Sequence, residues 1–319
     1  MADRNGSWFE HFIDGDSIDS IDGLCERVNE IFVRLTTDFT PLSTQNILDI
    51  PVERSEIPEE LFVSTVEAYK ALRRVKVGKA PGPDGIPNIV LKTFAFQLAP
   101  VIADIYNTSL CEGYLPPLLK SAAVIPVPKK CPVNDIEKDI RPISLTCQIA
   151  KVMEGFTLTR IFPTILLQLD NKQFAVAGKS TEQAIVYILH LALEALDNGN
   201  CSLRLFFADF SKGFDQIDHR ILMEKLSKFN IHNSLLRWIG AFLLERSQFV
   251  RIGNSTSTGQ FTNGGIPQGT KLDPILFAVM VNDLISIWGP RIKFVDDLTA
   301  LEIVPRNSPS YMDHIVSDI

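Results

Sequence analysis

Residues 203–215 read LRLFFADFSKGFD, and this stretch carries the pattern from which the fold can be predicted. The aromatic and aliphatic side chains that precede Asp209 are typical of a β-strand. Farther along the chain, residues 291–302 predict a hairpin whose tip holds Asp296 and Asp297. The sequence therefore predicts two strands that each present carboxylates at an end.

Carboxylates at the ends of buried strands need a partner for their charge. A hard divalent cation such as Mg²⁺ takes oxygen ligands, and two such ions about 3.5–4 Å apart can activate a hydroxyl nucleophile and stabilise a leaving pyrophosphate. In the alternative interpretation, Asp209 only caps the following helix, while Asp296 and Asp297 only form a turn. From these residues alone, the alternative is the stronger interpretation.

Three other motifs stand in a fixed order around the two strands. They are KAPGPDG at residues 79–85, RPISL at residues 141–145 and, between the two strands, GGIPQG at residues 264–269. With this order of motifs, the chain from about residue 60 onward resembles the reverse transcriptase domain of non-LTR retrotransposons of the LINE or jockey type. The resemblance implies an α+β fold with the fingers and palm of a right-hand polymerase, in which helices flank an antiparallel palm sheet.

The resemblance also implies a metal site at the strand ends. Asp209 corresponds to the first metal-binding carboxylate of the family and Asp296 to the second. Asp297 corresponds to the acid next to it, and the backbone carbonyl of Phe210 completes the metal shell. The implied cofactor is Mg²⁺, for which Mn²⁺ can substitute.

Four residues correspond to those that contact the incoming nucleotide in the family. Phe214 matches the bulky residue under the sugar that excludes a 2′-hydroxyl, whereas without the motif we would assign it to core packing. Gln268 matches a residue that lies against the nucleotide. Arg141 matches the fingers arginine that grips triphosphate oxygens, and Lys129 assists it. On its own, Lys129 would be assigned to a solvated turn.

Template and primer contacts are implied at three positions. Gly265 and Gly269 let the backbone approach template and primer. Lys79 begins a rigid loop rich in proline and glycine, and its basic surroundings suit template phosphates. Two positions depart from the family pattern, because Gly213 replaces an alanine and Asp273 stands where glycine or serine is usual. We expect both departures to loosen the site.

Composition divides the chain into an acidic beginning and a mildly basic remainder. Residues 1–60 hold 14 acidic and 4 basic residues, a net charge of −10, whereas the remainder carries +3 of the total of −7. Local basic patches, rather than the total charge, decide nucleic-acid binding. We predict an acidic segment over 1–60, fingers and the N-terminal part of the reverse transcriptase domain over 61–200, and a catalytic palm over 201–319.

Two classes of protein are excluded by the same inventory. The five cysteines are scattered and form no C-x-x-C pair, which argues against a zinc site or a disulfide framework. No apolar run reaches the roughly 18 residues of a membrane span, and the N-terminus lacks the pattern of a signal peptide. We therefore expect an intracellular protein that does not contact a membrane.

Local patterns predict the remaining elements. Helices are expected over 88–111, 144–166, 181–196, 221–228, 234–244 and 275–288, an amphipathic helix around 24–32, and a helix that starts with a capping box at Ser64 and Glu67 and ends near Gly78. Residues 122–127 predict a strand, which Pro126 favours at a sheet edge. Residues 248–252 and 258–262 predict a hairpin.

The resemblance implies an RNA-directed DNA polymerase, which adds deoxynucleotides to a primer 3′-hydroxyl on an RNA template. The chain stops shortly after the hairpin of Asp296 and Asp297, so we expect it to lack the thumb and the endonuclease of such elements. The alternative is a truncated or domesticated remnant that keeps the fold and binds RNA without polymerising. The intact Asp209, Asp296 and Asp297 favour the enzyme.

Overall fold

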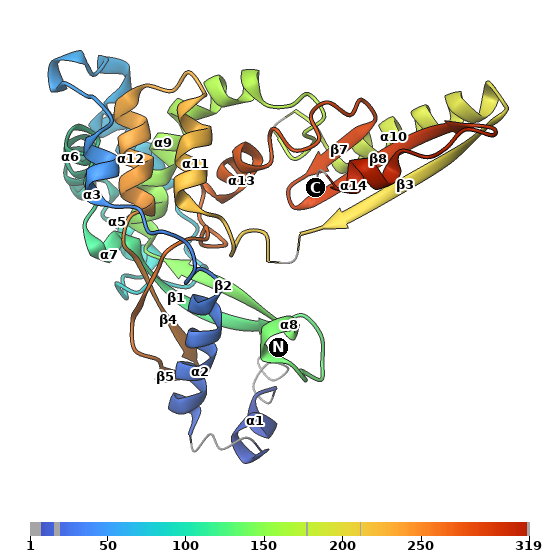
Figure 1. Cartoon of the computed structure of the whole chain (residues 1–319). Coiled ribbons are helices and arrows are strands. Elements are labelled where there is room, and N and C mark those ends of the chain that lie inside the picture. Colours follow the sequence, from blue (N-terminus) through green and yellow to red (C-terminus); the bar gives the residue numbers. More distant parts are fainter. Residues whose placement is uncertain (1–7, 16–19, 177, 211, 318–319) are drawn as a thin grey trace. The chain divides into compact units, whose positions relative to one another are not determined.

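The computed structural model describes residues 8–15, 20–176, 178–210 and 212–317 (Figure 1). Ser211 of the first strand motif lies outside these residues. The chain divides into two compact units, which are described separately. The first unit comprises the residues up to 161 together with 214–273, and the second comprises 162–213 and 274–319.

The first unit contains most of the helices. They are α1 (Glu10–Gly15), α2 (Ile21–Arg34), α3 (Thr44–Leu48), α4 (Thr65–Arg73), α5 (Asn88–Thr93), α6 (Ala95–Glu112), α7 (Pro117–Lys120), α8 (Ile136–Asp139), α11 (His219–Ser227) and α12 (Asn233–Leu243), with 3₁₀ turns at Arg54–Glu56 and Glu59–Leu61. Its strands are β1 (Ser121–Pro128), β2 (Ile140–Thr146), β4 (Arg246–Ile252), β5 (Ser255–Thr256) and β6 (Gln260–Thr262).

The second unit is built on a smaller sheet. Its elements are α10 (Thr181–Asp197), α14 (Met312–Ser317), β3 (Cys201–Asp209), β7 (Arg291–Phe294) and β8 (Asp297–Pro305). Two further helices, α9 (Gln148–Gln168) and α13 (Asp273–Met280), have residues in both units. Within the described residues, no helix is both long and apolar enough to cross a lipid bilayer.

Strand β1 lies inside the sheet of the first unit, which has the order β2-β1-β4-β5, with β6 also paired to β4. The prediction of an edge strand was therefore wrong. Strand β1 runs parallel to β4 only over Ser121–Val124, so Pro126 lies beyond this pairing. On the other side, the Lys129 N–H donates to the Asp139 carbonyl, so the alternation along the antiparallel ladder makes Pro126 and its partner Pro142 a non-hydrogen-bonded pair. The missing donor of Pro126 therefore costs no ladder hydrogen bond.

Helix α2 packs against β4 and β5 (Figure 1). It is amphipathic as predicted, and its Leu24 and Val28 are completely buried. Asn29 Nδ2 donates to the Thr258 carbonyl at 3.0 Å, and Gln248 Nε2 donates to Asn29 Oδ1 at 3.1 Å. The same hydrophobic cluster includes Trp8, Phe12, Phe32, Val124, Val250 and Ile252. Part of the acidic beginning of the chain therefore belongs to the core of the first unit.

At the start of α4, half of the predicted capping box is present. Ser64 caps the helix as predicted, because its Oγ accepts a hydrogen bond from the Glu67 backbone N–H at 3.2 Å. The Glu67 carboxylate pairs with the guanidinium of Arg160 on α9, with both oxygens 3.0 Å from a nitrogen. The side chain that should complete the capping box is therefore used in a bidentate ion pair between helices.

The second unit has an antiparallel sheet of order β3-β8-β7. Strand β3 pairs with β8 along its whole length, and α10 packs against β3 (Figure 1). Leu298 and Ala300 of β8 are buried with Met312 and Ile315 of α14. The predicted hairpin over residues 291–302 is confirmed by the pairing of β7 with β8.

The predicted helices differ in how well they match. Helices α10, α11 and α12 agree with the predictions within two residues at each end. The helix expected over 88–111 is divided at Phe94, and the one expected over 275–288 ends at Met280 and continues as turns. The helix expected from residue 144 starts at Gln148, because residues 144–146 extend the ladder between β1 and β2.

Candidate active site

Asp209 ends β3, and its register partner is Asp297, the first residue of β8. Residues that pair directly on antiparallel strands have Cα atoms about 4.5–5.5 Å apart. Asp297 is also the partner of Phe294 on β7, which leaves Val295 and Asp296 as the two-residue turn of the hairpin. The structure therefore brings the three predicted catalytic aspartates together at one end of the second unit's sheet.

The turn that carries Asp296 has an unusual backbone. Val295 has a φ of 55°, a left-handed conformation that a β-branched residue rarely adopts. Glycine, asparagine or aspartate is usual at such positions of a tight hairpin. Strain of this kind persists where the surrounding structure holds the backbone, and it is enriched at functional sites. The pairing of β7 with β8 holds this turn and so fixes where Asp296 lies.

Among the residues that the structure describes, no cation pairs with the carboxylates of this cluster. In the described parts of the chain, no ion pair includes Asp209, Asp296 or Asp297. Burial, and then the negative charges of Asp296 and Asp209, raises the pKa of Asp297. Carboxylate oxygens are the ligands that Mg²⁺ prefers, so the donors suit this ion chemically. Over the same described residues, no group of three or more His, Cys, Asp and Glu side chains forms a complete metal site.

The carbonyl of Phe210 keeps capacity for another ligand. It accepts a hydrogen bond from the Gly213 N–H at 3.1 Å, and a carbonyl oxygen has two lone pairs. A Cβ at Gly213 would lie 3.1 Å from both Phe210 Cβ and Phe277 Cε2. Glycine thus fits the tight packing around Phe210, where the alanine usual in the family would require these neighbours to shift.

A buried ion cluster anchors β7, the strand that leads to the turn. Asp170 accepts hydrogen bonds from two nitrogens of Arg291 at 2.8 Å, and Lys293 Nζ lies 2.9 Å from its second oxygen. Lys293 is only 1% exposed and also donates to the carbonyl of Asn282 at 2.8 Å. Burial alone would raise the pKa of Asp170, but the two cations and a backbone N–H lower it to about 2.

In the first unit, the GGIPQG loop (Gly264–Gly269) is tied to the segment that begins at Phe214. The Gly265 N–H donates to the carbonyl of Ile217 at 2.8 Å, and the Ile266 N–H donates to the carbonyl of Phe214 at 2.8 Å. These bonds hold the predicted sugar-contacting residue beside the loop that carries Gln268.

His219 adds a third tie to the same loop. Its Nε2 lies 2.7 Å from the carbonyl oxygen of Gly265, and the side chain is only 1% exposed. Burial lowers the pKa of His219 to about 4, so the ring is neutral near pH 7 and donates through Nε2. Gly265 has a φ of 77°, and a Cβ there would lie 2.9 Å from the carbonyl oxygen of Asp215. Glycine is therefore required here by packing within the protein.

Gln268 is held by both its side chain and its backbone. Its Nε2 donates to Asp215 Oδ1 at 3.0 Å, and its carbonyl accepts from the Ser144 N–H at 3.2 Å. The next residue, Gly269, donates its N–H to Asp273 Oδ2 at 2.8 Å. Burial raises the pKa of Asp273 to about 6. Asp273, the second departure from the family pattern, therefore fixes the end of the loop.

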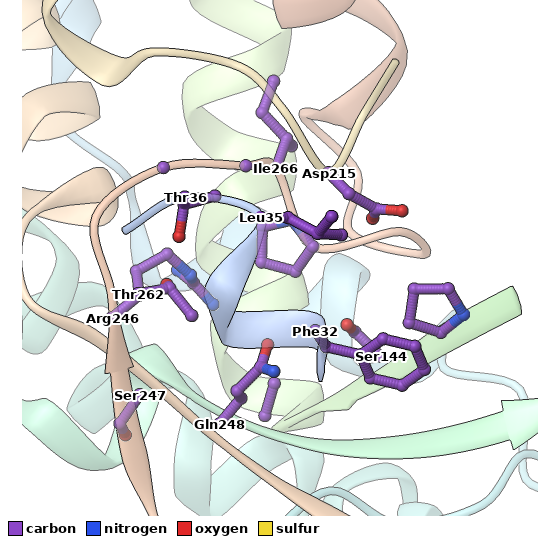
Figure 2. Close-up of a pocket in the computed structure, with 15 residues that line it drawn as sticks. Phe32, Leu35, Thr36, Ser144, Asp215, Arg246, Ser247, Gln248, Thr262 and Ile266 are labelled. Atoms are coloured by element: carbon purple, nitrogen blue, oxygen red, sulfur yellow. The ribbon is translucent and has the colours of Figure 1, made fainter. Parts of the chain in front are cut away.

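A pocket opens beside this loop (Figure 2). Figure 2 shows Asp215 and Ile266 on the side of the pocket next to the loop, and Gln248 of β4 on a different side. Arg246 also lines the pocket, is 2% exposed and donates through Nη1 to the carbonyl of Phe242 at 2.9 Å. Its buried Nη2 has no hydrogen-bond partner among the described residues. The pocket wall therefore keeps one donor of the kind that ordered water often satisfies.

Arg141 and Lys129 lie where the ladder between β1 and β2 ends. Arg141 is the register partner of Val127, and Lys129 directly follows the last residue of β1. The Lys129 N–H donates to the carbonyl of Asp139 at 2.7 Å, which continues the hairpin by one bond. Both side chains are exposed. The structure therefore places the two predicted triphosphate-binding cations near one end of this hairpin.

Lys79 is exposed, and the loop that it begins is anchored at nearby residues of the same segment. Gly82 of this loop is buried, and a Cβ there would lie 2.5 Å from the backbone of Cys147. Asn88 Nδ2 donates to the carbonyl of Lys76 at 3.0 Å and closes the loop from the other side. The rigid loop predicted from its prolines and glycines is thus held against the end of β2.

The predicted residues fall into two groups, one in each unit. The second unit contains Asp209, Phe210, Asp296 and Asp297, whereas the first contains Lys79, Lys129, Arg141, Phe214, Gly265, Gln268 and Gly269. Sequence reasoning missed Asp170, Asp215 and His219. Asp215 could have been found because it is the last residue of the motif over 203–215. Nothing in the sequence links Asp170 to Arg291, which lies 121 positions away.

Comparison with known proteins agrees with these motifs. The profile of the family described as reverse transcriptase (RNA-dependent DNA polymerase) matches residues 127–315. The chain is 27% identical over 225 residues to the RNA-directed DNA polymerase from mobile element jockey of Drosophila melanogaster, which covers 70% of this chain and 24% of that protein. It is 24% identical over 316 residues to the retrovirus-related Pol polyprotein from type-1 retrotransposable element R1 of Bradysia coprophila, which covers 95% of this chain and 30% of that protein.

The chain thus spans 24% and 30% of the length of these two curated relatives. The profile match nevertheless extends over more than half of the chain and includes the strand motif, the GGIPQG loop and the hairpin of Asp296 and Asp297. This protein belongs to the reverse transcriptase family and carries a reverse transcriptase domain of the non-LTR retrotransposon type.

Proposed function

We propose that this chain carries an RNA-directed DNA polymerase, which adds deoxynucleotides to the 3′-hydroxyl of a DNA primer on an RNA template. The observation that best supports the proposal is the pairing of Asp209 with Asp297 beside the turn of Asp296. Carboxylates held together by strand pairing repel one another unless a cation lies between them. Such an arrangement has little structural benefit but is what binding of a hard metal ion requires.

Asp209, Asp296 and the carbonyl of Phe210 would hold Mg²⁺ or Mn²⁺. When bound, a pair of these ions lowers the pKa of the primer hydroxyl and neutralises the leaving pyrophosphate. Asp297 lies next to both carboxylates, and burial, followed by their negative charges, raises its pKa. The protein contributes the position of these oxygens, which β3, β8 and the strained turn hold in place.

The nucleotide would be positioned by residues of the first unit. Arg141 and Lys129 are exposed cations that suit triphosphate oxygens. Phe214 would lie under the sugar and exclude a 2′-hydroxyl, and Gln268 would contact the nucleotide from the anchored loop. Phosphoryl transfer depends mostly on positioning and charge stabilisation, so these residues have no covalent role.

The right-hand architecture is part of the same proposal. We assign residues 61–200 to the fingers and the N-terminal part of the domain, and residues 201–319 to the palm. The order of the motifs supports this assignment, as does the antiparallel sheet whose strands carry the aspartates. Lys79, Gly265 and Gly269 would then lie along template and primer.

Primer extension on an RNA template tests the proposal. We expect the wild-type chain to extend a DNA primer with deoxynucleotides and Mg²⁺, and Asp296→Asn to reduce extension to background. Asp313→Asn is a matched control, because Asp313 is an exposed acid on α14 of the same unit. Thermal unfolding of each variant shows that the loss does not come from misfolding.

Two outcomes would contradict the proposal. Equal extension by the wild type and Asp296→Asn would mean that the synthesis comes from a contaminating polymerase. No extension by a folded wild-type chain would favour the remnant that keeps the fold, and RNA binding by that chain would then be measured directly.

A further inference from the structure

The side chain of Gln268 makes one hydrogen bond within the described part of the chain, to a residue from a distant motif. Gln268 Nε2 lies 3.0 Å from Asp215 Oδ1, and the two residues are 53 positions apart in the sequence. Both belong to the first unit. Their segments are also in close contact through the backbone, since a Cβ at Gly265 would lie 2.9 Å from the Asp215 carbonyl oxygen.

This contact determines which way the amide of Gln268 faces. An ionised carboxylate accepts hydrogen bonds and cannot donate them, so Asp215 selects the amide nitrogen and excludes the amide oxygen. Gln268 Oε1 is therefore turned away from Asp215, together with the second N–H of the amide. If Asp215 lost its acceptor, the amide could rotate by 180° and exchange a donor for an acceptor.

The backbone of Gln268 does not depend on Asp215's carboxylate. Its carbonyl accepts from the Ser144 N–H, and the next residue, Gly269, donates to Asp273. The loop is tied separately by the bond from the Ile266 N–H to the Phe214 carbonyl. Removing the carboxylate of Asp215 should thus release the side chain of Gln268 and leave the loop in place.

We propose that Asp215 is a positioning residue, which fixes the orientation of the Gln268 amide so that its oxygen and remaining N–H face the incoming deoxynucleotide. The inference rests on the proposed polymerase function, and it assigns a role that the sequence motif alone does not. Asp215 acts through Gln268, so its substitution should weaken nucleotide binding more than it slows nucleotide addition once the nucleotide is bound.

Steady-state primer extension separates these two effects. We expect Asp215→Ala to raise the KM for deoxynucleotides about tenfold, the size of one lost hydrogen bond, with a smaller change in kcat. Asp215→Asn keeps an oxygen acceptor for Gln268 Nε2 and should stay near the wild-type KM. Asp218→Ala is the matched control, because Asp218 caps α11 through bonds to the Arg220 and Ile221 N–H groups and should alter stability alone.

A double-mutant cycle distinguishes positioning from a general structural effect. Gln268→Met removes the amide and should raise KM on its own. If Asp215 acts through Gln268, the double variant Asp215→Ala with Gln268→Met is no worse than Gln268→Met alone. Fully additive effects on KM would overturn the proposal.

Nuclear magnetic resonance provides a measurement that does not need activity. The side-chain amide resonances of Gln268 are identified by their loss in Gln268→Met, and they should shift in Asp215→Ala but not in Asp218→Ala. Unchanged resonances in Asp215→Ala would overturn the positioning role. An inactive wild type in which Asp215→Ala still shifts these resonances would contradict the proposed function and leave the contact itself confirmed.

Discussion

Asp209 and Asp297 face each other across the last rung of the ladder between β3 and β8. Because main-chain pairing sets the separation of their Cα atoms, the two residues cannot move apart without opening the end of the sheet. A divalent cation would remove the repulsion between them, and protonation of one carboxylate would do so at lower pH. Burial, and then this repulsion from Asp209 and Asp296, raises the pKa of Asp297.

Mg²⁺ should therefore stabilise the folded protein. At a concentration ten times its Kd, an ion that binds only the native state raises the free energy of unfolding by about 1.4 kcal/mol. Thermal unfolding with and without Mg²⁺ measures this shift, which Asp209→Asn should abolish and Asp313→Asn should retain. An equal shift in all three proteins would place the bound ion elsewhere.

Substitution of Phe214 should weaken discrimination against ribonucleotides. If its ring blocks the 2′-hydroxyl, Phe214→Ala opens that space, and the ratio of kcat/KM for deoxynucleotides to that for ribonucleotides should fall about 10- to 100-fold. Phe261→Ala is a suitable control, because Phe261 is 69% exposed on β6 of the same unit. Unchanged discrimination in Phe214→Ala would assign this ring to packing.

The loop that carries Lys79 offers a paired test of packing. A methyl group at Gly82 would lie 2.5 Å from the backbone of Cys147, so Gly82→Ala should cost about 1–3 kcal/mol of stability. A Cβ at Gly78 would have no other atom within 4 Å, so Gly78→Ala should change stability by less than about 0.5 kcal/mol. Urea unfolding compares the two, and similar costs would mean that the loop does not dock on β2.

The buried cluster around Asp170 should matter for acid stability. Its folded pKa of about 2 lies below the ordinary value of 3.8, so its contribution is present above pH 4 and is lost as the pH falls toward 2. The shift corresponds to about 2 kcal/mol. Asp170→Asn leaves Arg291 and Lys293 buried without their anion and should cost about 3–5 kcal/mol at pH 7. Denaturant unfolding checks both values, and Asp313→Asn should show neither effect.

His219 should make stability fall in mildly acidic solution. Its folded pKa of about 4 lies below the ordinary 6.5, so the unfolded chain binds the proton first, and stability is lost as the pH falls from 6.5 to 4. Between pH 7 and pH 5, this residue should account for about 2 kcal/mol. Burial of Glu154, whose pKa is raised to about 7, acts in the opposite direction.

The contribution of His219 is therefore measured as a difference between proteins. The free energy of unfolding is measured for the wild type and for His219→Gln at pH 7 and pH 5. In the difference between the two proteins, the pH-dependent contributions that they share cancel, including that of Glu154. The variant should lose about 2 kcal/mol less stability between these two pH values than the wild type. His314→Gln, at an exposed position of α14, should behave as the wild type does.

Features set by neighbours in the sequence were predictable. The cap at Ser64, the end of α6 one residue beyond the expected position 111 and the hairpin of residues 291–302 follow from local residue types. The aspartates at the strand ends were predictable for the same reason. Their register was not, because it depends on which strand pairs with β3 nearly one hundred positions later.

Long-range contacts account for what sequence reasoning missed. The position of β1 inside its sheet results from parallel pairing with β4, and no local pattern around Pro126 indicates that partner. Likewise, the Glu67 carboxylate left its expected place because Arg160 lies 93 positions away and offers a bidentate partner. In both cases a tertiary contact outweighed a correct local preference.

Helix α2 bears on how this domain can be dissected. A fragment cut to the family match at residues 127–315 would begin near the end of β1 and lose the Ser121–Val124 stretch that pairs with β4. It would also lose α2, so the buried faces of Val250 and Ile252 would meet solvent. The segment that the family profile matches is thus shorter than the segment that folds, and a fragment cut to that match alone should aggregate.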